Sequence, residues 1–305
     1  MKPQLLRRVV ALLGGSGFTL SNCMGSRSCF DIIARKRELV LLVKVLSNIE
    51  GLNSNTVHEL KKVSSIMGGV PIVVGERLKS SKLLEGVLYE RYGVHALNIE
   101  TLADVMSNSM PVAHSIRGNY CVNINSEMLR RLRTRMDLTQ EELARELGVS
   151  KQSVYRYESS GKVLFDVMER MMEVFKHEGR LLLHETVFGQ GVKDESNEFN
   201  MHVARMKRFV AEKLDHMGFS TSITNAPFDV VARDDENVYT VVSNDQRRLE
   251  HKVELMGQIT RMVGGHSMCV TSRQVSFGKR GVVVMKPEDL DSFHSTEELI
   301  EWISG

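Results

Sequence analysis

A six-residue phrase that occurs twice constrains the fold of this chain more than any other feature. Phe-Asp-Ile-Ile-Ala-Arg at residues 30–35 returns as Phe-Asp-Val-Val-Ala-Arg at residues 228–233. Each phrase is preceded by Gly-Phe and followed by a charged turn, an apolar run, a helix-like stretch that ends in Gly-Gly and another apolar run. We interpret the two ends of the chain as copies of one duplicated unit.

Each copy has the pattern of a small α/β domain, helix–strand–strand–helix–strand–strand–helix. The near-continuous apolar run at residues 39–43 indicates a strand covered on both faces, so we expect a mixed sheet with helices packed on it. We expect α/β domains at 1–110 and 203–305, an all-helical domain at 120–182 and a polar linker at 183–202. The predicted fold class is multidomain α+β, with a central all-α five-helix bundle between two duplicated α/β domains.

The most informative motif lies at residues 138–158. Thr139, with Glu142 three residues later, forms a capping box that predicts the start of a helix. Gly148 permits the positive φ of a tight turn, and Ser150 can cap the next helix. Apolar residues at helical spacing supply the buried faces: Leu143, Ala144, Leu147, Val154 and Tyr157. The motif predicts a helix-turn-helix.

This pattern resembles the lambda-repressor/Cro-like (XRE-type) helix-turn-helix family over about residues 127–178. The matching features are an arginine-rich first helix and the phrases Leu-Thr-Gln-Glu-Glu-Leu-Ala, Leu-Gly-Val-Ser and Tyr-Glu. The family places its second helix, here 151–158, in the major groove of DNA. The resemblance implies base contacts from four residues: Lys151, Gln152, Ser153 and Arg156. It implies phosphate contacts from three more: Gln140, Ser150 and Arg133.

The two terminal copies resemble the restriction-endonuclease-like PD-(D/E)xK fold, as in archaeal Holliday-junction resolvases, because Asp31 and Lys44 fall on successive predicted strands. That chemistry needs two carboxylates for Mg²⁺ and a lysine near the attacking water. The acid position before Lys44 holds Leu42, and the second copy keeps only Asp229. We therefore predict no catalytic residues, no metal and no enzyme activity. The aspartates would instead cap strand ends or pair with a nearby arginine, Arg35 or Arg233.

The order of all three parts also resembles a family of archaeal helix-turn-helix transcriptional regulators over nearly the whole chain. It implies a sequence-specific regulator that binds double-stranded DNA, and we expect a cytoplasmic homodimer on an inverted repeat. The terminal copies should contribute to its interface, either between chains or by clasping within one chain. A structure-specific nuclease, its inactive DNA-binding relative and a protein-docking coactivator remain alternatives.

No sequence pattern calls for a cofactor, and no apolar run approaches the length of a membrane span. The net charge of +2 implies that any polyanion is met by a local patch. The operator, the sign of regulation and any small-molecule effector are not specified by the sequence.

Overall fold

The computed structural model describes residues 2–23, 28–116, 118–176, 181–184, 187–188, 205–273, 275 and 281–305. It divides into two compact units, residues 1–73 with 190–305 and residues 74–189. Among its described helices none is both long and apolar enough to span a bilayer. The predicted linker at 183–202 lies outside the described residues, apart from 183–184 and 187–188. The boundaries at 1–110, 120–182, 183–202 and 203–305 stay a prediction.

The first unit holds the amino-terminal part of the first copy. Its elements are α1 (Lys2–Gly15), β1 (Thr19–Asn22), β2 (Ile32–Lys36), β3 (Leu39–Asn48), η1 (Ile49–Gly51), α2 (Ser54–Ile66) and the start of β4 (Val70–Leu78). Strand order is β1-β2-β3-β4. Val40–Val43 of β3 are all buried, which confirms the prediction of a strand covered on both faces.

The same unit holds the whole second copy. Its elements are α8 (Arg205–His216), β11 (Ser220–Ile223), β12 (Val230–Arg233), β13 (Asn237–Val242), α9 (Gln246–Val263), β14 (His266–Val270), β15 (Val283–Met285), η3 (Pro287–Ser292) and α10 (Thr296–Ser304). Strand order is β11-β12-β13-β14-β15, with the first two pairs antiparallel and the last two parallel. The matching order of elements confirms the duplicated fold.

One strand that both copies share was not predicted from the sequence. β1 and β11 lie between the first helix and the repeated phrase, and each is a sheet edge with a single neighbouring strand. Their sequences, Thr-Leu-Ser-Asn and Ser-Thr-Ser-Ile, are short and largely polar. They are half-exposed, so they lack the apolar run by which buried strands are recognised.

The two copies clasp each other within one chain. α2 packs against β11 and β12, and α9 packs against β1 and β2. A single buried core joins both copies, with Phe30 and Phe228 at a ring-centroid distance of 6.5 Å. We expected the copies to contact each other either between chains or within one chain. In the first unit the contact is within one chain.

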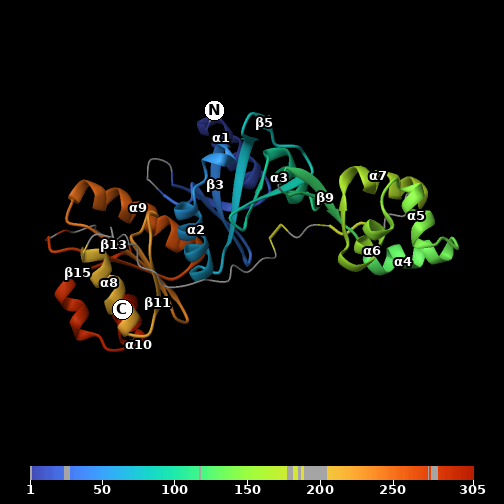
Figure 1. Ribbon diagram of the computed structural model, residues 1–305. Coiled ribbons are helices and arrows are strands. Elements are labelled where there is room, and N and C mark those ends of the chain that lie inside the picture. The colour runs from blue at the N-terminus through green and yellow to red at the C-terminus, as the bar shows by residue number, and fades with distance from the viewer. Residues whose placement is uncertain are drawn as a thin grey trace. The chain divides into compact units, whose positions relative to one another are not determined.

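The second unit begins with the rest of the first copy and continues into the central helices. Its elements are β5 (Ser81–Lys82), β6 (Val87–Arg91), β7 (Val94–Leu97), α3 (Ile99–Met106), β8 (Ala113–Ile116), β9 (Asn119–Asn123), α4 (Ser126–Arg135), α5 (Gln140–Glu146), α6 (Lys151–Ser160), β10 (Lys162–Leu164) and α7 (Phe165–Val174). In Figure 1 the helices α4 to α7 form one cluster. β10 pairs antiparallel with β9.

The bundle differs from the sequence prediction at one point. Its described part, residues 126–174, contains four helices. Val163 and Leu164, which we expected in a helix together with Val167 and the residues after it, lie instead in β10. Gly161 causes the change, because it ends α6 in the left-handed conformation at φ +66°. Its carbonyl then accepts a hydrogen bond from the amide of Ile124 at 2.7 Å, which continues the β9–β10 ladder.

The Gly264-Gly265 pair between α9 and β14 offers a matched test of this packing. Both residues have positive φ, +88° and +98°. A methyl group on Gly264 would meet nothing within 4 Å, whereas one on Gly265 would overlap the backbone carbonyl of Asn237. Gly264→Ala should cost about 1–2 kcal/mol for the strained backbone. Gly265→Ala should cost about 1–3 kcal/mol more because of the overlap.

Urea unfolding followed by the fluorescence of the single tryptophan, Trp302 in α10, measures both variants. Equal midpoints for the two variants would contradict the close approach at Gly265.

Candidate nucleic-acid interface

α6 presents a polar face to solvent. Its buried side consists of Val154, Tyr157 and Glu158. Lys151, Gln152 and Arg156 are exposed on the opposite side, and Ser153 is half-buried. The structure thus brings together the four residues that the sequence predicted as base contacts. Their contacts with DNA stay a prediction.

Tyr155 belongs to the same exposed face and was not among the predicted residues. Its side chain is 62% exposed, the largest exposed fraction among the large hydrophobic residues of the described chain. It lies one helical turn after Lys151, so helical spacing alone could have placed it on the outward face.

The start of α6 is held by a short chain of hydrogen bonds. Ser150 caps the helix by accepting a bond from the amide of Ser153 at 3.1 Å, as the sequence predicted. The hydroxyls of Ser150 and Ser153 are 2.9 Å apart, and Arg156 Nη2 donates to Ser153 Oγ at 3.3 Å. These contacts orient Arg156 towards the amino-terminal end of α6.

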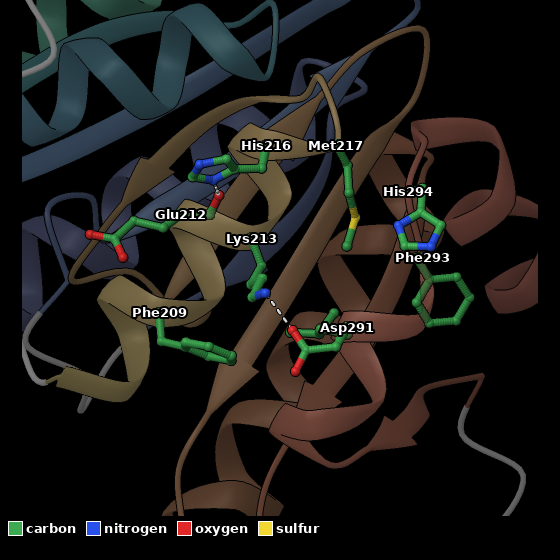
Figure 2. A pocket seen from close by; sticks show the side chains of 9 residues that line it. Phe209, Glu212, Lys213, His216, Met217, Asp291, Phe293 and His294 are labelled. Carbon is green, nitrogen blue, oxygen red and sulfur yellow. Dashed lines mark hydrogen bonds and ion pairs between the residues drawn. The ribbon is translucent and has the colours of Figure 1, made fainter.

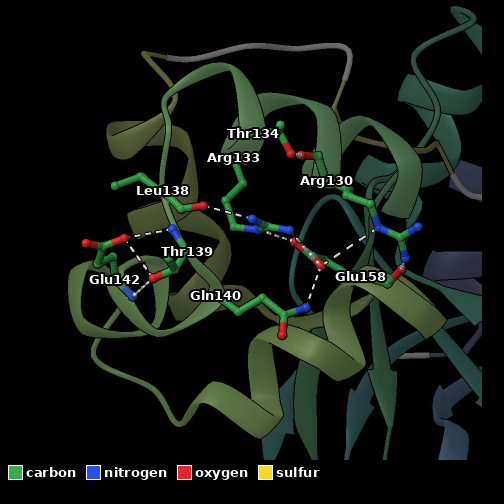
Figure 3. Close-up of polar contacts among 8 residues, drawn as sticks. All are labelled: Arg130, Arg133, Thr134, Leu138, Thr139, Gln140, Glu142 and Glu158. Carbon is green, nitrogen blue, oxygen red and sulfur yellow. Dashed lines mark hydrogen bonds and ion pairs between the residues drawn. The ribbon is translucent and has the colours of Figure 1, made fainter.

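Three residues of the bundle converge on the buried carboxylate of Glu158, as Figure 3 shows. Arg133 Nε donates to Oε1 at 2.5 Å, and Gln140 Nε2 donates to Oε2 at 2.8 Å. Arg130 Nε lies 3.9 Å from Oε2. The cluster ties α4 and the start of α5 to the end of α6, so it fixes α6 relative to the other two helices.

The charge of Glu158 is stabilised in this cluster. Burial acts to raise its pKa, but the hydrogen bonds from Arg133 and Gln140 and the positive charges of Arg133 and Arg130 outweigh burial. The pKa of Glu158 therefore lies below its ordinary value, and the carboxylate is ionised at neutral pH.

Two of the three predicted phosphate contacts, Arg133 and Gln140, thus already have an internal partner. Arg133 also donates from Nη1 to the carbonyl of Leu138 at 2.8 Å, and its side chain is 15% exposed. Ser150 is exposed at the start of α6. Sequence reasoning did not assign a role to Glu158, although the charge of a carboxylate at a buried helix position signals a partner.

The start of α5 has the predicted capping box. The amide of Glu142 donates to Thr139 Oγ1 at 3.2 Å, and the amide of Thr139 donates to the Glu142 carboxylate at 2.8 Å. The turn that follows has Gly148 at φ +62°, also as predicted.

The residues that resemble a nuclease site are paired with lysines. Asp31 lies 3.0 Å from Lys2 Nζ and 3.6 Å from Lys44 Nζ. Asp229 lies 2.6 Å from Lys207 Nζ and 2.5 Å from Lys252 Nζ. Leu42, at the position of the missing acid, is fully buried in the core that the two copies share. Within the described residues no group of three or more potential metal-ligating side chains is found.

The alternative role that we gave the aspartates, an ion pair with Arg35 or Arg233, is wrong. Arg35 Nη1 donates to the carbonyl of Met262 at 3.0 Å, and Arg233 Nη1 donates to the carbonyl of Ile66 at 3.1 Å. Each arginine reaches across to the end of the other copy's long helix. The arginines of the repeated phrase therefore help to hold the two copies together.

A separate pocket of about 490 Å³ lies between α8 and η3. Figure 2 shows Lys213 directed across it to Asp291, with which it forms an ion pair. The rest of the lining combines aromatic, imidazole and aliphatic side chains with one further carboxylate: Phe209, Glu212, His216, Met217, Leu290, Phe293 and His294. The lysine and the aspartate satisfy each other, and no bound group identifies a ligand for the pocket.

The fold and the interface define a class, a helix-turn-helix protein joined to a nuclease-like fold. Residues 129–176 match a helix-turn-helix family model, and residues 2–112 match a model of the PD-(D/E)XK superfamily domain. No solved structure matches the chain significantly.

Relatives that match along the whole chain are named "putative HTH-type transcriptional regulatory protein". One from Methanococcus maripaludis strain C6 is 32% identical and covers 99% of this chain and 97% of its own length. Others come from Methanocaldococcus jannaschii, 29% identical over 100% and 97%, and Thermococcus kodakarensis, 30% identical over 99% and 95%. The chain belongs to this archaeal family of HTH-type transcriptional regulatory proteins.

The Glu158 cluster predicts how the bundle responds to mutation and pH. Glu158→Gln should destabilise it by about 3 kcal/mol, because Arg133 loses its counter-charge inside the protein. Since the pKa of Glu158 is lowered, its contribution is present above the ordinary value of 4.5 and is lost as pH falls through the lowered pKa. The wild-type bundle should therefore lose stability on acidification below about pH 4.5, and the variant should lose less.

Hydrogen exchange of the α4 to α6 amides measures the effect locally. Glu127→Gln is the matched control, because Glu127 is 72% exposed in an ion pair with Arg131 on the surface of α4. If the α4 to α6 amides exchanged at the same rate in both variants, the Glu158 cluster would not stabilise the bundle.

Proposed function

We propose that this protein is a sequence-specific DNA-binding transcriptional regulator that inserts α6 into the major groove. The observation that carries the proposal is the face of α6, where long polar side chains lie opposite the buried Val154 and Tyr157. A helix of this kind with its outward residues at the amino-terminal end is the reading element of helix-turn-helix proteins. The names of the family's members support the regulatory role.

The residue roles follow from the chemistry of each side chain. Gln152 pairs with an adenine, and Lys151 and Arg156 donate to guanine O6 and N7. Ser153 contacts a base edge next to them. Tyr155 adds an exposed ring, which makes apolar contact with a thymine methyl group or packs on the sugar.

Phosphate contacts hold this helix in register. Ser150 lies at the start of α6, where backbone amides also face an anion. Gln140 Nε2 has a second hydrogen besides the one on Glu158, and we assign that hydrogen to a phosphate. Arg133 retains one further N–H on Nη1. Its phosphate contact is part of the proposal, although its bonds to Glu158 and Leu138 also explain the residue.

In this proposal the protein has no catalytic activity and needs no cofactor. It acts in the cytoplasm, where the DNA is. The match to the PD-(D/E)XK superfamily favours one second candidate, a structure-specific nuclease. Against it stand Leu42 in the acid position, buried, and the lysine pairing of Asp31. Cutting of duplex or four-way-junction DNA with Mg²⁺ or Mn²⁺, abolished by Asp31→Ala, would establish the nuclease instead.

We propose further that the protein acts as a homodimer on an inverted repeat. One reading helix covers too few base pairs to discriminate against a genome, and two-fold pairing doubles the site. The clasp uses apolar surface of the two copies within one chain, so the pairing surface must lie elsewhere. Leu164 and Phe165, adjacent at the start of α7, are each 43% exposed and offer such a surface in the bundle.

Selection of bound sequences from random DNA tests the reading helix. Gln152→Ala should cost about 1–3 kcal/mol on the preferred site and relax the preference at one base position. Glu169→Ala, which changes an exposed residue of α7, is the control and should leave the selected motif unchanged. An unaltered motif in the Gln152 variant would refute the assignment, and no selected motif at all would favour the protein-docking coactivator.

Light scattering tests the dimer. At micromolar concentration the protein should have about twice the mass of a 34.4 kDa chain, and Phe165→Ser should shift the mass towards that of the monomer. Footprinting should show two protected half-sites about 34 Å apart or at multiples of this distance. A monomeric wild type that protects a single half-site rejects the dimer while leaving the reading helix intact.

A further inference from the structure

The side-chain hydroxyl of Ser153 lies between the cap of α6 and Arg156. On one side Ser153 Oγ is 2.9 Å from Ser150 Oγ. On the other side it accepts a hydrogen bond from Arg156 Nη2 at 3.3 Å. We predicted separate contacts with DNA for these residues, Ser150 with a phosphate and the other two with bases. In the protein the three side chains are linked to one another.

The direction of each hydrogen bond follows from the number of hydrogens that each group carries. A hydroxyl donates one hydrogen and accepts two, and a guanidinium only donates. Ser150 Oγ accepts the backbone amide hydrogen of Ser153 at 3.1 Å, so one of its two acceptor positions is filled. The contact between the two hydroxyls can run in either direction, and the hydroxyl that donates in it has no hydrogen for another acceptor.

A phosphate on Ser150 selects one of these two directions. The phosphate oxygens of DNA accept hydrogen bonds and do not donate them, so Ser150 reaches a phosphate through its own hydroxyl hydrogen. The hydrogen between the two serine oxygens then comes from Ser153. Ser153 Oγ keeps both of its acceptor positions, and Arg156 fills one of them.

Tyr157 competes for the same hydrogen. Burial raises the pKa of this phenol, while the positive charge of Arg156 and a hydrogen bond with Ser153 act against the rise. A hydrogen bond that lowers the pKa of a phenol is one that Ser153 donates to it. Ser153 thus has two acceptors in reach, Tyr157 and Ser150, and a phosphate that takes the Ser150 hydrogen favours Ser150 as the acceptor.

With a phosphate present, all the bonds of the chain run the same way. Arg156 donates to Ser153, Ser153 donates to Ser150, and Ser150 donates to the phosphate. Hydrogen bonds that run one way polarise one another. The anion at the end of the chain therefore strengthens the bond that holds the guanidinium in place.

We propose that Ser150, Ser153 and Arg156 form a hydrogen-bond relay, through which a DNA phosphate on Ser150 positions Arg156 to read its base. The relay rests on the proposed function, in which α6 enters the major groove. It couples a contact that fixes register to a contact that reads sequence. Ser153 is a positioning residue in the relay. Its free acceptor position limits its own base contact to an amino group, adenine N6 or cytosine N4.

The test compares the binding motifs that full-length variants select from random DNA. Arg156→Ala first identifies the position that Arg156 reads, as the base pair at which the motif loses preference. Ser153→Ala should lower the preference at that same position about fivefold, a coupling typical of neighbours in one hydrogen-bond network. Ser150→Ala should lower it too, beyond the uniform loss of affinity caused by the missing helix cap.

Two variants separate the relay from a loss of structure. Ser153→Thr keeps the hydroxyl and should restore the preference. Ser159→Ala is the matched control and should select the wild-type motif, because Ser159 lies on the same helix but donates to the backbone carbonyl of Arg156, at 3.1 Å.

A double-mutant cycle tests the order of the chain. Binding is measured by fluorescence anisotropy on the selected site and on a site changed at the Arg156 position. In the relay, Ser150→Ala no longer affects the preference at this position once Ser153 is replaced by alanine. Equal effects of Ser150→Ala with and without Ser153 would show that the phosphate contact acts by another route.

The outcomes distinguish the relay from the proposed function. If Arg156→Ala relaxes one position and Ser153→Ala leaves that position unchanged, the relay is wrong and the reading helix stands. If Tyr157→Phe, which keeps the ring, lowers the preference at the Arg156 position, the Ser153 hydrogen is directed to Tyr157 and the relay is overturned. An Arg156→Ala motif that equals the wild-type motif also overturns the relay, and a wild type that selects no motif overturns both proposals.

Discussion

The buried core that the two copies share is the interaction on which the first unit depends. Neither sheet is covered by its own helices alone, because α2 packs on β11 and β12 while α9 packs on β1 and β2. The rings of Phe30, Phe228 and Tyr239 pack against one another at tilted angles in this core, with ring centroids 6.5 and 5.1 Å apart. Truncating one such fully buried aromatic typically costs about 3–5 kcal/mol. The clasp therefore accounts for why the repeated phrase keeps its phenylalanine.

The contact between the copies also explains why a leucine stands at the acid position of the nuclease-like motif. Leu42, in the acid position, contributes to the shared core, so an acid there would be buried without a partner at a large cost. Asp31 and Asp229, next to the strand pairs, are each paired with two lysines. The position that resembles the second acid of a nuclease therefore contributes to the contact between the copies.

In the helix-turn-helix bundle a polar cluster, rather than an apolar core, fixes how the elements are arranged. Arg133, Gln140 and Glu158 come from three helices, and their mutual bonds fix the angle at which α6 is presented. A buried charge network of this kind gives one arrangement rather than many, because every displaced arrangement leaves an unpaired charge. The residues on the outward face of α6 therefore do not hold the bundle together, apart from the cap at Ser150 and the hydrogen bond between Arg156 and Ser153.

Sequence alone determined the features that depend on neighbours along the chain. The capping box at Thr139, the turn at Gly148 and the outward face of α6 follow from local rules, and the duplication follows from a repeated phrase. Tertiary structure decided whatever depends on residues far apart. The partners of Asp31 and Asp229, the reach of Arg35 and Arg233 into the other copy, the β10 strand and the convergence on Glu158 all join distant segments. Local spacing carries no information on such contacts, because they are set by how the packed elements meet.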